Sequence, residues 1–277
     1  MNPDKTRNLL QIIAFIIFLV IWVVLLDSLI PKLIAGKYLK GILIEMSCIS
    51  GVGAAYLGIR LKWDGMSIKE TAIFPPSSVK GTIFKGMLLG SALIGSVYLL
   101  ALGGGLIRVS YAVLNAKYIA LLSAGVFMTA AWEELAFRGL VLPKLGEVIG
   151  MHRACLVVAA AFGLMHPLSP VKSFQMILST TIAGLLLNYA FVVSEGIYFP
   201  IGIHFGWNFF NFLLYPKSTE YLVPWLAGRA NPEEGLIAII ITAAGLAAVI
   251  WRRKAVTWKE EKTEIYEFIA KVMMTSS

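Results

Sequence analysis

Charged residues and cysteines are both scarce in this sequence. Asp, Glu, Lys and Arg together make up 14% of the 277 residues, whereas 58% are hydrophobic. This balance is typical of a protein that crosses a membrane several times rather than of a soluble domain. The two cysteines, Cys48 and Cys155, both lie inside apolar runs. They argue against a disulfide framework and against a thiolate metal site, and they favour packing roles.

Internal repeats and low-complexity tracts are also missing, and long apolar runs take their place. A membrane helix needs about 20 predominantly apolar residues, and eight runs reach or approach this length. They predict an all-α membrane protein with about eight transmembrane helices, in a conical bundle whose core encloses an intramembrane site. The runs are 9–30, 41–61, 84–102, 118–142, 154–166, 174–193, 197–214 and 236–251.

The domain boundaries and the orientation follow from the same runs. Residues 1–254 are expected to form one polytopic membrane domain, with the functional motifs between 118 and 214. Residues 255–277 place apolar side chains at helical spacing among Lys and Glu, which predicts an amphipathic tail on the cytoplasmic membrane surface. Lys and Arg are more numerous in the loops on the side of the two termini. The positive-inside rule therefore predicts that both termini are cytoplasmic, and it explains the net charge of +8 without nucleic-acid binding.

Three ionisable residues, Glu133, Glu134 and Arg138, interrupt the fourth apolar run. Each such side chain at the centre of a membrane helix costs about 2.5–3.5 kcal/mol on insertion scales, so it persists only where it faces protein or a wet cavity. Glu134 and Arg138 are four residues apart with the acid first, the favourable order for an ion pair on a helix. Glu133 is turned about 100° away from Glu134. The sequence therefore predicts one neutralised carboxylate and leaves Glu133 as a candidate base.

Two of the three histidines lie in later apolar runs. His166 ends the pattern Phe162-x-x-x-His166, and His204 begins the pattern His204-x-x-x-Asn208, so the members of each pair share a helix face. A single buried histidine is usually a satisfied hydrogen-bonding group. Six polar groups on three membrane helices, however, find no partners in lipid, so we expect them to converge.

An antiparallel hairpin is expected between the fourth and fifth runs, turning near Gly146-Glu147. It would bring Glu133 and His166 to a comparable depth, which predicts a site in the cytoplasmic half of the membrane. Asn188 and the Thr180-Thr181 pair are expected either to line this site or to bond one helix to another.

Such a group has the parts needed to hydrolyse an amide bond. A carboxylate surrounded by apolar side chains is a better base for activating water, which suits Glu133, and His166 can share the proton of that water. His204 and Asn208 can donate hydrogen bonds to the oxyanion. Two histidines and a carboxylate are also a known catalytic zinc set, so Glu133, His166 and His204 would be the ligands of a divalent metal. Metal-free water activation is favoured, since the sequence has no His-Glu-x-x-His helix.

The three motifs, in this order, resemble those of the CPBP family of intramembrane proteases. That family includes the type II CAAX prenyl endopeptidases and bacterial proteins associated with bacteriocin processing or self-immunity. The resemblance covers about residues 130–210 and implies an endopeptidase whose substrate is a membrane-associated peptide or protein, lipidated or not. The roles that it implies are water activation for Glu133 and His166, oxyanion stabilisation for His204 and Asn208, and support of the site for Glu134, Arg138 and Phe162.

Two other classes of protein stay open at this point. Paired carboxylates with arginine and histidine in membrane helices also form proton relays in transporters, although no matched pair of broken helices is found here. A non-hydrolytic immunity or scaffold protein would keep the motifs without turnover. The expected partners are membrane lipids and a peptide or protein substrate, with no nucleic acid.

Overall fold

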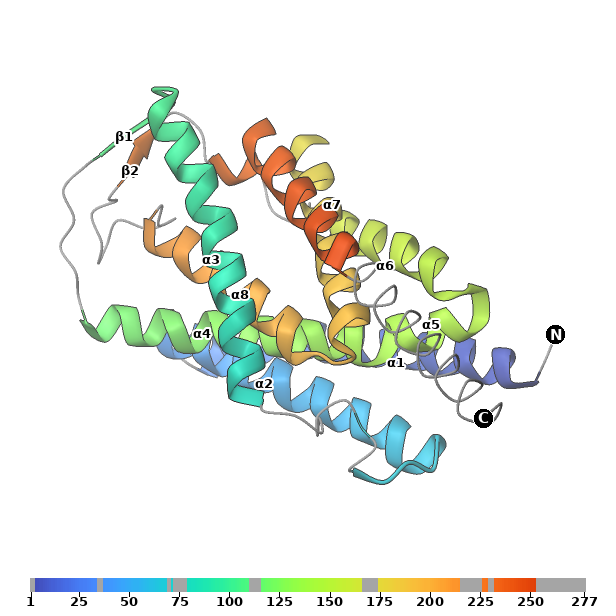
Figure 1. Cartoon of the computed structure of the whole chain (residues 1–277). Helices are drawn as coiled ribbons and strands as arrows, with labels where there is room; N and C mark the ends of the chain where they lie inside the picture. The colour runs from blue at the N-terminus through green and yellow to red at the C-terminus, as the bar shows by residue number, and fades with distance from the viewer. Residues whose placement is uncertain are drawn as a thin grey trace, which may run out of the picture.

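Helices make up almost all of the structure, a computed structural model that describes residues 3–33, 37–68, 71, 79–109, 116–165, 174–214, 226–228 and 232–252. The all-α prediction is confirmed, with one short antiparallel pair, β1 (Ile107–Val109) and β2 (Leu226–Gly228), added to it. The predicted tail 255–277 and the domain boundary at 254 lie outside the described residues. The helices, shown in Figure 1, are α1 (Pro3–Leu33), α2 (Lys37–Leu57), η1 (Gly58–Trp63), α3 (Val79–Gly103), α4 (Ala116–Glu134), η3 (Leu135–Val141), α5 (Leu142–Ile149), α6 (Met151–Met165), α7 (Phe174–Ser194), α8 (Tyr198–Leu214), the short turn η5 (Pro232–Glu234) and the helix Leu236–Arg252.

Five helical segments are long and apolar enough to cross a membrane. They are Asp4–Leu26, Lys40–Trp63, Val79–Gly103, Ile119–Ile149 and Phe174–Ser194. The other three predicted runs coincide with shorter helices, α6 with 15 residues, α8 with 17 residues and the helix Leu236–Arg252. The eight apolar runs therefore all have helical counterparts, and five of these have the length and composition of a complete span.

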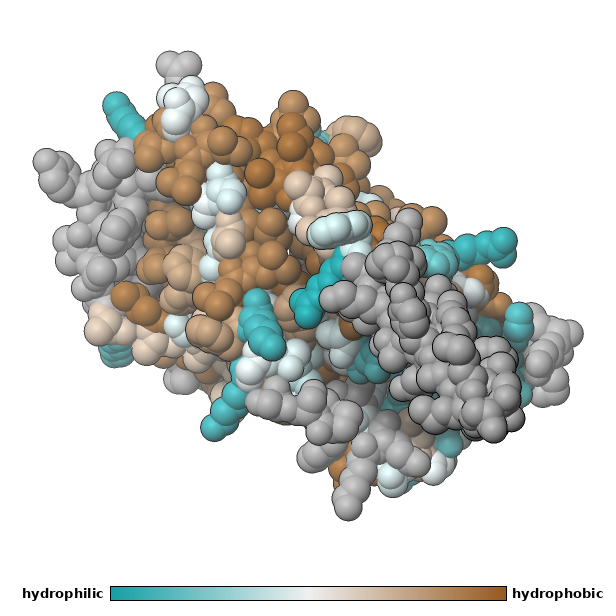
Figure 2. All heavy atoms as spheres, in the orientation of Figure 1, coloured by the Kyte–Doolittle hydropathy of each residue, from teal (hydrophilic) through white to brown (hydrophobic). Residues whose placement is uncertain are grey.

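Apolar side chains cover the outside of the helices as well as their contacts. Along α1, Ile13, Ile17, Val20 and Val24 are each more than half exposed. Figure 2 shows a broad apolar surface over the region that α3 and the helix Leu236–Arg252 occupy in Figure 1. Exposed apolar patches of this kind mark membrane contact, because lipid tails are as apolar as the side chains that face them.

Helices α3 and α8 cross with their backbones in contact, and glycines make this possible (Figure 1). Gly86 and Gly90 on α3 face Gly202 and Gly206 on α8, and a Cβ atom at any of these positions would collide with the backbone of the other helix. Small residues four apart are the usual means of close helix packing in membranes. His204 lies between the two glycines of α8, so this glycine seam fixes the depth of the histidine.

The hairpin after the fourth run turns later than Gly146-Glu147. The π-helical segment η3 and helix α5 continue α4, and the chain reverses at Gly150, whose φ of 87° favours glycine. The predicted turn position is wrong because the polar residues of this stretch belong to an amphipathic helix instead of a loop. Lys144, for example, is buried on α5 and donates a 2.8 Å hydrogen bond to Asp64.

Candidate active site

Glu134 and Arg138 form the ion pair that their four-residue spacing predicts. Arg138 Nη1 donates to Glu134 Oε1 at 2.9 Å, and both side chains are 0% exposed. The guanidinium also donates from Nε to Asn188 Oδ1 at 2.8 Å and from Nη2 to the Gly184 carbonyl at 3.1 Å, both on α7. Each of the three guanidinium nitrogens therefore has an acceptor, and Arg138 joins the end of α4 to α7.

Asn188 and Phe162 complete the surroundings of the guanidinium. Asn188 Nδ2 donates to the Cys155 carbonyl of α6 at 2.8 Å, so this asparagine bonds one helix to another, which is one of the two expected roles. The Phe162 ring lies 4.8 Å from the guanidinium carbon of Arg138, at cation–π distance. The same ring meets His204 edge to face, with 6.2 Å between the ring centroids.

His204 lies between the two adjacent carboxylates. Its Nδ1 is 2.9 Å from Glu134 Oε1, and its Nε2 is 3.9 Å from Glu133 Oε2. Because an ionised carboxylate only accepts hydrogen bonds, the proton of the first contact belongs to Nδ1. The other ring nitrogen is thereby directed toward Glu133, whose side chain is 15% exposed.

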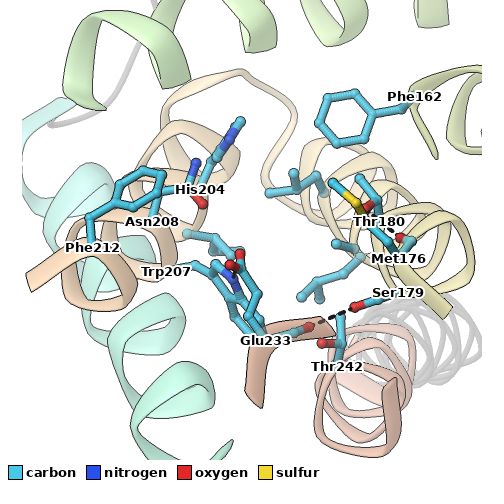
Figure 3. Close-up of a pocket in the computed structure, with 14 residues that line it drawn as sticks. Phe162, Met176, Ser179, Thr180, His204, Trp207, Asn208, Phe212, Glu233 and Thr242 are labelled. Carbon is cyan, nitrogen blue, oxygen red and sulfur yellow. Dashed lines mark hydrogen bonds between the residues drawn. The ribbon is translucent and has the colours of Figure 1, made fainter. Parts of the chain in front are cut away.

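Asn208 follows His204 by one helical turn and lines the same cavity. This cavity measures about 180 Å³, and its walls come from α6, α7, α8, the η5 turn and the helix Leu236–Arg252. Figure 3 shows His204 and Asn208 on one wall, with Phe162 and Thr180 across from them. A polar edge made by the histidine and the asparagine thus borders a largely apolar space, a composition that is usual for ligand-binding pockets.

The part of the chain that carries these residues is similar to a known protein family. Residues 115–210 match the model of a family described as type II CAAX prenyl endopeptidase Rce1-like, and the matched range contains all three motifs. Over this range the chain is similar to that family. No curated protein and no solved structure matches the chain. The five described helices that are long and apolar enough to cross a membrane support an integral membrane protein.

The described structure brings most of the predicted site residues together. Five of them contact one another in one chain of interactions, and Asn208 lies beside them on the cavity wall. His166 follows the last described residue of α6 and lies outside the described residues. The five residues that contact one another are Glu133, Glu134, Arg138, Phe162 and His204.

Metal ligation at this site stays a prediction. Within the described ranges, no group of three or more His, Cys, Asp or Glu is arranged to hold a metal ion. The proposed ligand set consists of Glu133, His166 and His204, and only two of these are described. Those two face each other with 3.9 Å between Glu133 Oε2 and His204 Nε2.

Two residues outside the motifs, Trp207 and Glu233, also line the cavity, and a third, Asn211, bonds Glu233; the motifs do not include any of them. Asn211, seven residues after His204, lies on the same face of α8, so helical spacing alone was a usable signal. Its Nδ2 donates to the Glu233 carboxylate, which also accepts from Trp207 Nε1 at 3.1 Å. Glu233 carried no signal, because nothing local to it indicates that the chain returns to the cavity.

Proposed function

We propose that the chain is an intramembrane endopeptidase that hydrolyses a peptide bond of a membrane-associated substrate, lipidated or not, with water activated by Glu133. The observation that carries the proposal is the placement of His204 between Glu133 and Glu134 inside the family-matched range. Buried ionisable groups in membrane helices are costly and therefore mark function.

Glu134 and Arg138 prepare the histidine in this mechanism. Glu134 Oε1 accepts from both Arg138 Nη1 and His204 Nδ1, which fixes the orientation of the imidazole, as the carboxylate of a catalytic triad does. With its Nδ1 proton committed to Glu134, His204 donates from Nε2 only as an imidazolium. In that form the charges of the two carboxylates balance those of Arg138 and His204, which favours the cluster in a low-dielectric environment.

Glu133 acts as the base in the hydrolytic step. Its carboxylate takes a proton from a water molecule, with His166 sharing that proton, and the water oxygen attacks the scissile carbonyl carbon. The carbonyl oxygen becomes an oxyanion, which His204 Nε2–H and the Asn208 amide stabilise. The C–N bond then breaks, and the proton held by Glu133 passes to the leaving amine.

The finer architecture belongs to the same proposal. At 1.5 Å per residue a 15-residue helix such as α6 extends over about 22 Å, less than the roughly 30 Å of a bilayer core. We infer that α6, α8 and the helix Leu236–Arg252 complete a bundle of eight helices around a site part-way through the membrane. Both termini and the amphipathic tail 255–277 then face the cytoplasm.

The experiment uses the full chain purified into lipid nanodiscs and a library of lipidated and unlipidated peptides. Glu133→Gln and His204→Ala are each expected to reduce cleavage at least about 100-fold, the usual loss when one group stabilising the transition state is removed. His152→Ala is the matched control, because His152 is exposed and bonds Tyr189 away from the cluster. Cleavage at the wild-type rate by Glu133→Gln would overturn the proposal.

A strong chelator, added in a parallel arm, separates the two ways of activating water. Activity that survives chelation supports free water, whereas loss that zinc restores assigns Glu133, His166 and His204 as ligands. Failure of the folded wild type to cut any peptide would contradict the protease proposal and favour the transport or scaffold alternatives.

A further inference from the structure

Glu233 enters the cavity from a different part of the chain than the motifs. It belongs to the η5 turn, after the described strand β2, and its carboxylate lies between α7 and α8 in Figure 3. Trp207 Nε1 donates to Oε1 at 3.1 Å, and Asn211 Nδ2 donates to Oε2. The backbone carbonyl of Glu233 accepts a longer, 3.3 Å hydrogen bond from Ser179 of α7. The carboxylate is thus held by two side-chain donors of α8.

The two donors are positioned by groups other than Glu233. The Tyr98 hydroxyl of α3 donates to Asn211 Oδ1 at 2.7 Å, which leaves the amide nitrogen of Asn211 to donate to Glu233. Both Tyr98 and Asn211 are almost completely buried. Trp207 is on the same helix, next to the glycine seam between α3 and α8. The packing of these two helices therefore builds a pair of donors that suits one carboxylate.

This pair of donors continues the polar edge of the proposed active site. His204, Trp207, Asn208 and Asn211 follow one another at spacings of three and four on α8, so they share one face. Three of them line the cavity together with Glu233. A peptide bound along this face would pass from the oxyanion donors to the place that the Glu233 carboxylate fills.

We propose that Trp207 and Asn211 form a carboxylate-binding subsite of the cavity and that Glu233 is its resident occupant, displaced by a substrate carboxylate. The inference rests on the proposed protease function and names a chemical feature of its substrate. The Asn211 side chain is buried, and a buried donor without an acceptor is destabilising, so the subsite needs an acceptor in the absence of substrate. The substrate carboxylate has two sources, an acidic side chain or a free C-terminus.

The test measures binding separately from cleavage, on the inactive Glu133→Gln background in nanodiscs. Three labelled peptides of one parent sequence are compared by fluorescence anisotropy. The first is neutral with an amidated C-terminus, the second carries an acidic side chain and an amidated C-terminus, and the third is neutral with a free C-terminus. The second and third peptides, called acidic below, each add one carboxylate and differ only in its source. Their order of affinity therefore identifies that source.

Removal of the resident carboxylate is expected to favour the preferred acidic peptide. Glu233→Ala should increase its affinity, relative to the neutral peptide, about 10-fold, because a hydrogen bond to a charged group contributes about 1.5–3 kcal/mol and 1.4 kcal/mol is tenfold. Glu233→Gln should give a smaller gain, since its neutral side chain still accepts from the donors. Asn211→Leu should abolish the preference for acidic peptides. Glu234→Ala, which changes the neighbouring acid of the same turn, is the control.

The results separate this inference from the proposed function. Equal affinity of Glu233→Ala for acidic and neutral peptides, or weaker binding of all three, would make Glu233 a structural residue and overturn the subsite. The expected binding pattern, with no cleavage of any peptide by the chain that retains Glu133, would uphold the subsite and overturn the protease. Should Glu233→Ala fail to fold, the affinities of Glu233→Gln and Asn211→Leu for the acidic and neutral peptides are compared instead.

Discussion

The charges of the site are arranged around one carboxylate oxygen. Glu134 Oε1 is 2.9 Å from Arg138 Nη1 and 2.9 Å from His204 Nδ1, so it holds the guanidinium and the imidazole in fixed orientations. Glu133, one residue earlier, approaches the other nitrogen of the same imidazole. The two adjacent carboxylates therefore differ in their contacts: Glu134 bonds both Arg138 and His204 Nδ1, whereas Glu133 approaches His204 Nε2.

Arg138→Met is expected to destabilise the fold by about 3–5 kcal/mol. The substitution leaves Glu134 buried without its main counter-charge, and breaking one partner of a buried pair has this effect. Arg138→Lys should also destabilise, because lysine lacks the planar fork that reaches Asn188 and Gly184 together. The free energy of unfolding is measured by titration with a denaturing detergent.

The control for Arg138 is Arg7→Met. Arg7 pairs with Asp4 at 3.6 Å on the surface, where ion pairs contribute little, so its loss should go undetected. The double variant Glu134→Gln/Arg138→Met should recover part of the lost stability while cleavage stays absent, because His204 loses its charged acceptor. Wild-type stability of Arg138→Met would show that the pair is not buried as described.

Local spacing explains which of these contacts the sequence predicts. The Glu134–Arg138 pair follows from a separation of four residues on one helix. The contact of His204 with Glu134 joins residues seventy positions apart, so only the lack of partners in lipid indicated a meeting, without saying which carboxylate bonds the ring. The return of Glu233 to the cavity depends on the path of a connection between helices, for which the sequence has no local signal.

Two features of the helices, the glycine seam and the π-helical segment, hold the site in place. The seam between α3 and α8 sets the depth of His204. The segment η3 begins directly after Glu134 and carries Arg138. The apolar runs predict where the helices lie, because a membrane helix needs a long apolar stretch. They do not predict the π-helical segment, since its composition is that of the surrounding helix. Such segments often occur at functional sites.

Gly90→Ala is expected to lower both the stability of the fold and the rate of cleavage, because it disrupts the glycine seam. Its new methyl group would collide with the Ile203 carbonyl, and overpacking of this kind typically costs about 1–3 kcal/mol. Separation of the two helices would also displace His204 and lower kcat more than it raises KM. Thermal unfolding and steady-state kinetics measure the two effects.

Gly95→Ala provides the matched control on the same helix. A Cβ atom at Gly95 meets no atom within 4 Å, and alanine is up to about 1 kcal/mol better than glycine in a helix. This variant should therefore be as stable as the wild type or more so, with unchanged kinetics. Equal effects of Gly90→Ala and Gly95→Ala would contradict a special role of the seam.

At the scale of the whole molecule, a polar cluster ties the first helix to the site-bearing helices. Asp64, after the second span, accepts from Lys144 on α5 at 2.8 Å, from Gln11 on α1 at 2.8 Å and from Arg60 at 3.1 Å. Arg60 also donates to the carbonyl of Gly139 in η3. Composition and apolar runs predict the all-α class and where the apolar helices lie in the chain. They do not predict this cluster, because its members come from three separate parts of the chain.

The cluster makes the stability of the molecule depend on pH. Burial alone would raise the pKa of the Asp64 carboxyl, but the hydrogen bonds and charges of Lys144, Gln11 and Arg60 together lower this pKa below its usual value of 3.8. A carboxyl whose pKa is lower in the folded state stabilises the fold above its unfolded pKa and loses this contribution as the pH falls through its folded pKa.

Asp64→Asn should therefore reduce the free energy of unfolding by about 2 kcal/mol near pH 7. The difference from wild type should stay constant down to about pH 5 and shrink below pH 3.8. Unfolding in detergent between pH 3 and pH 7 measures it, with the exposed Asp4→Asn as the control that shows no such trend. A difference that persists undiminished at the acid end would show that the ionised form of Asp64 does not hold these helices together.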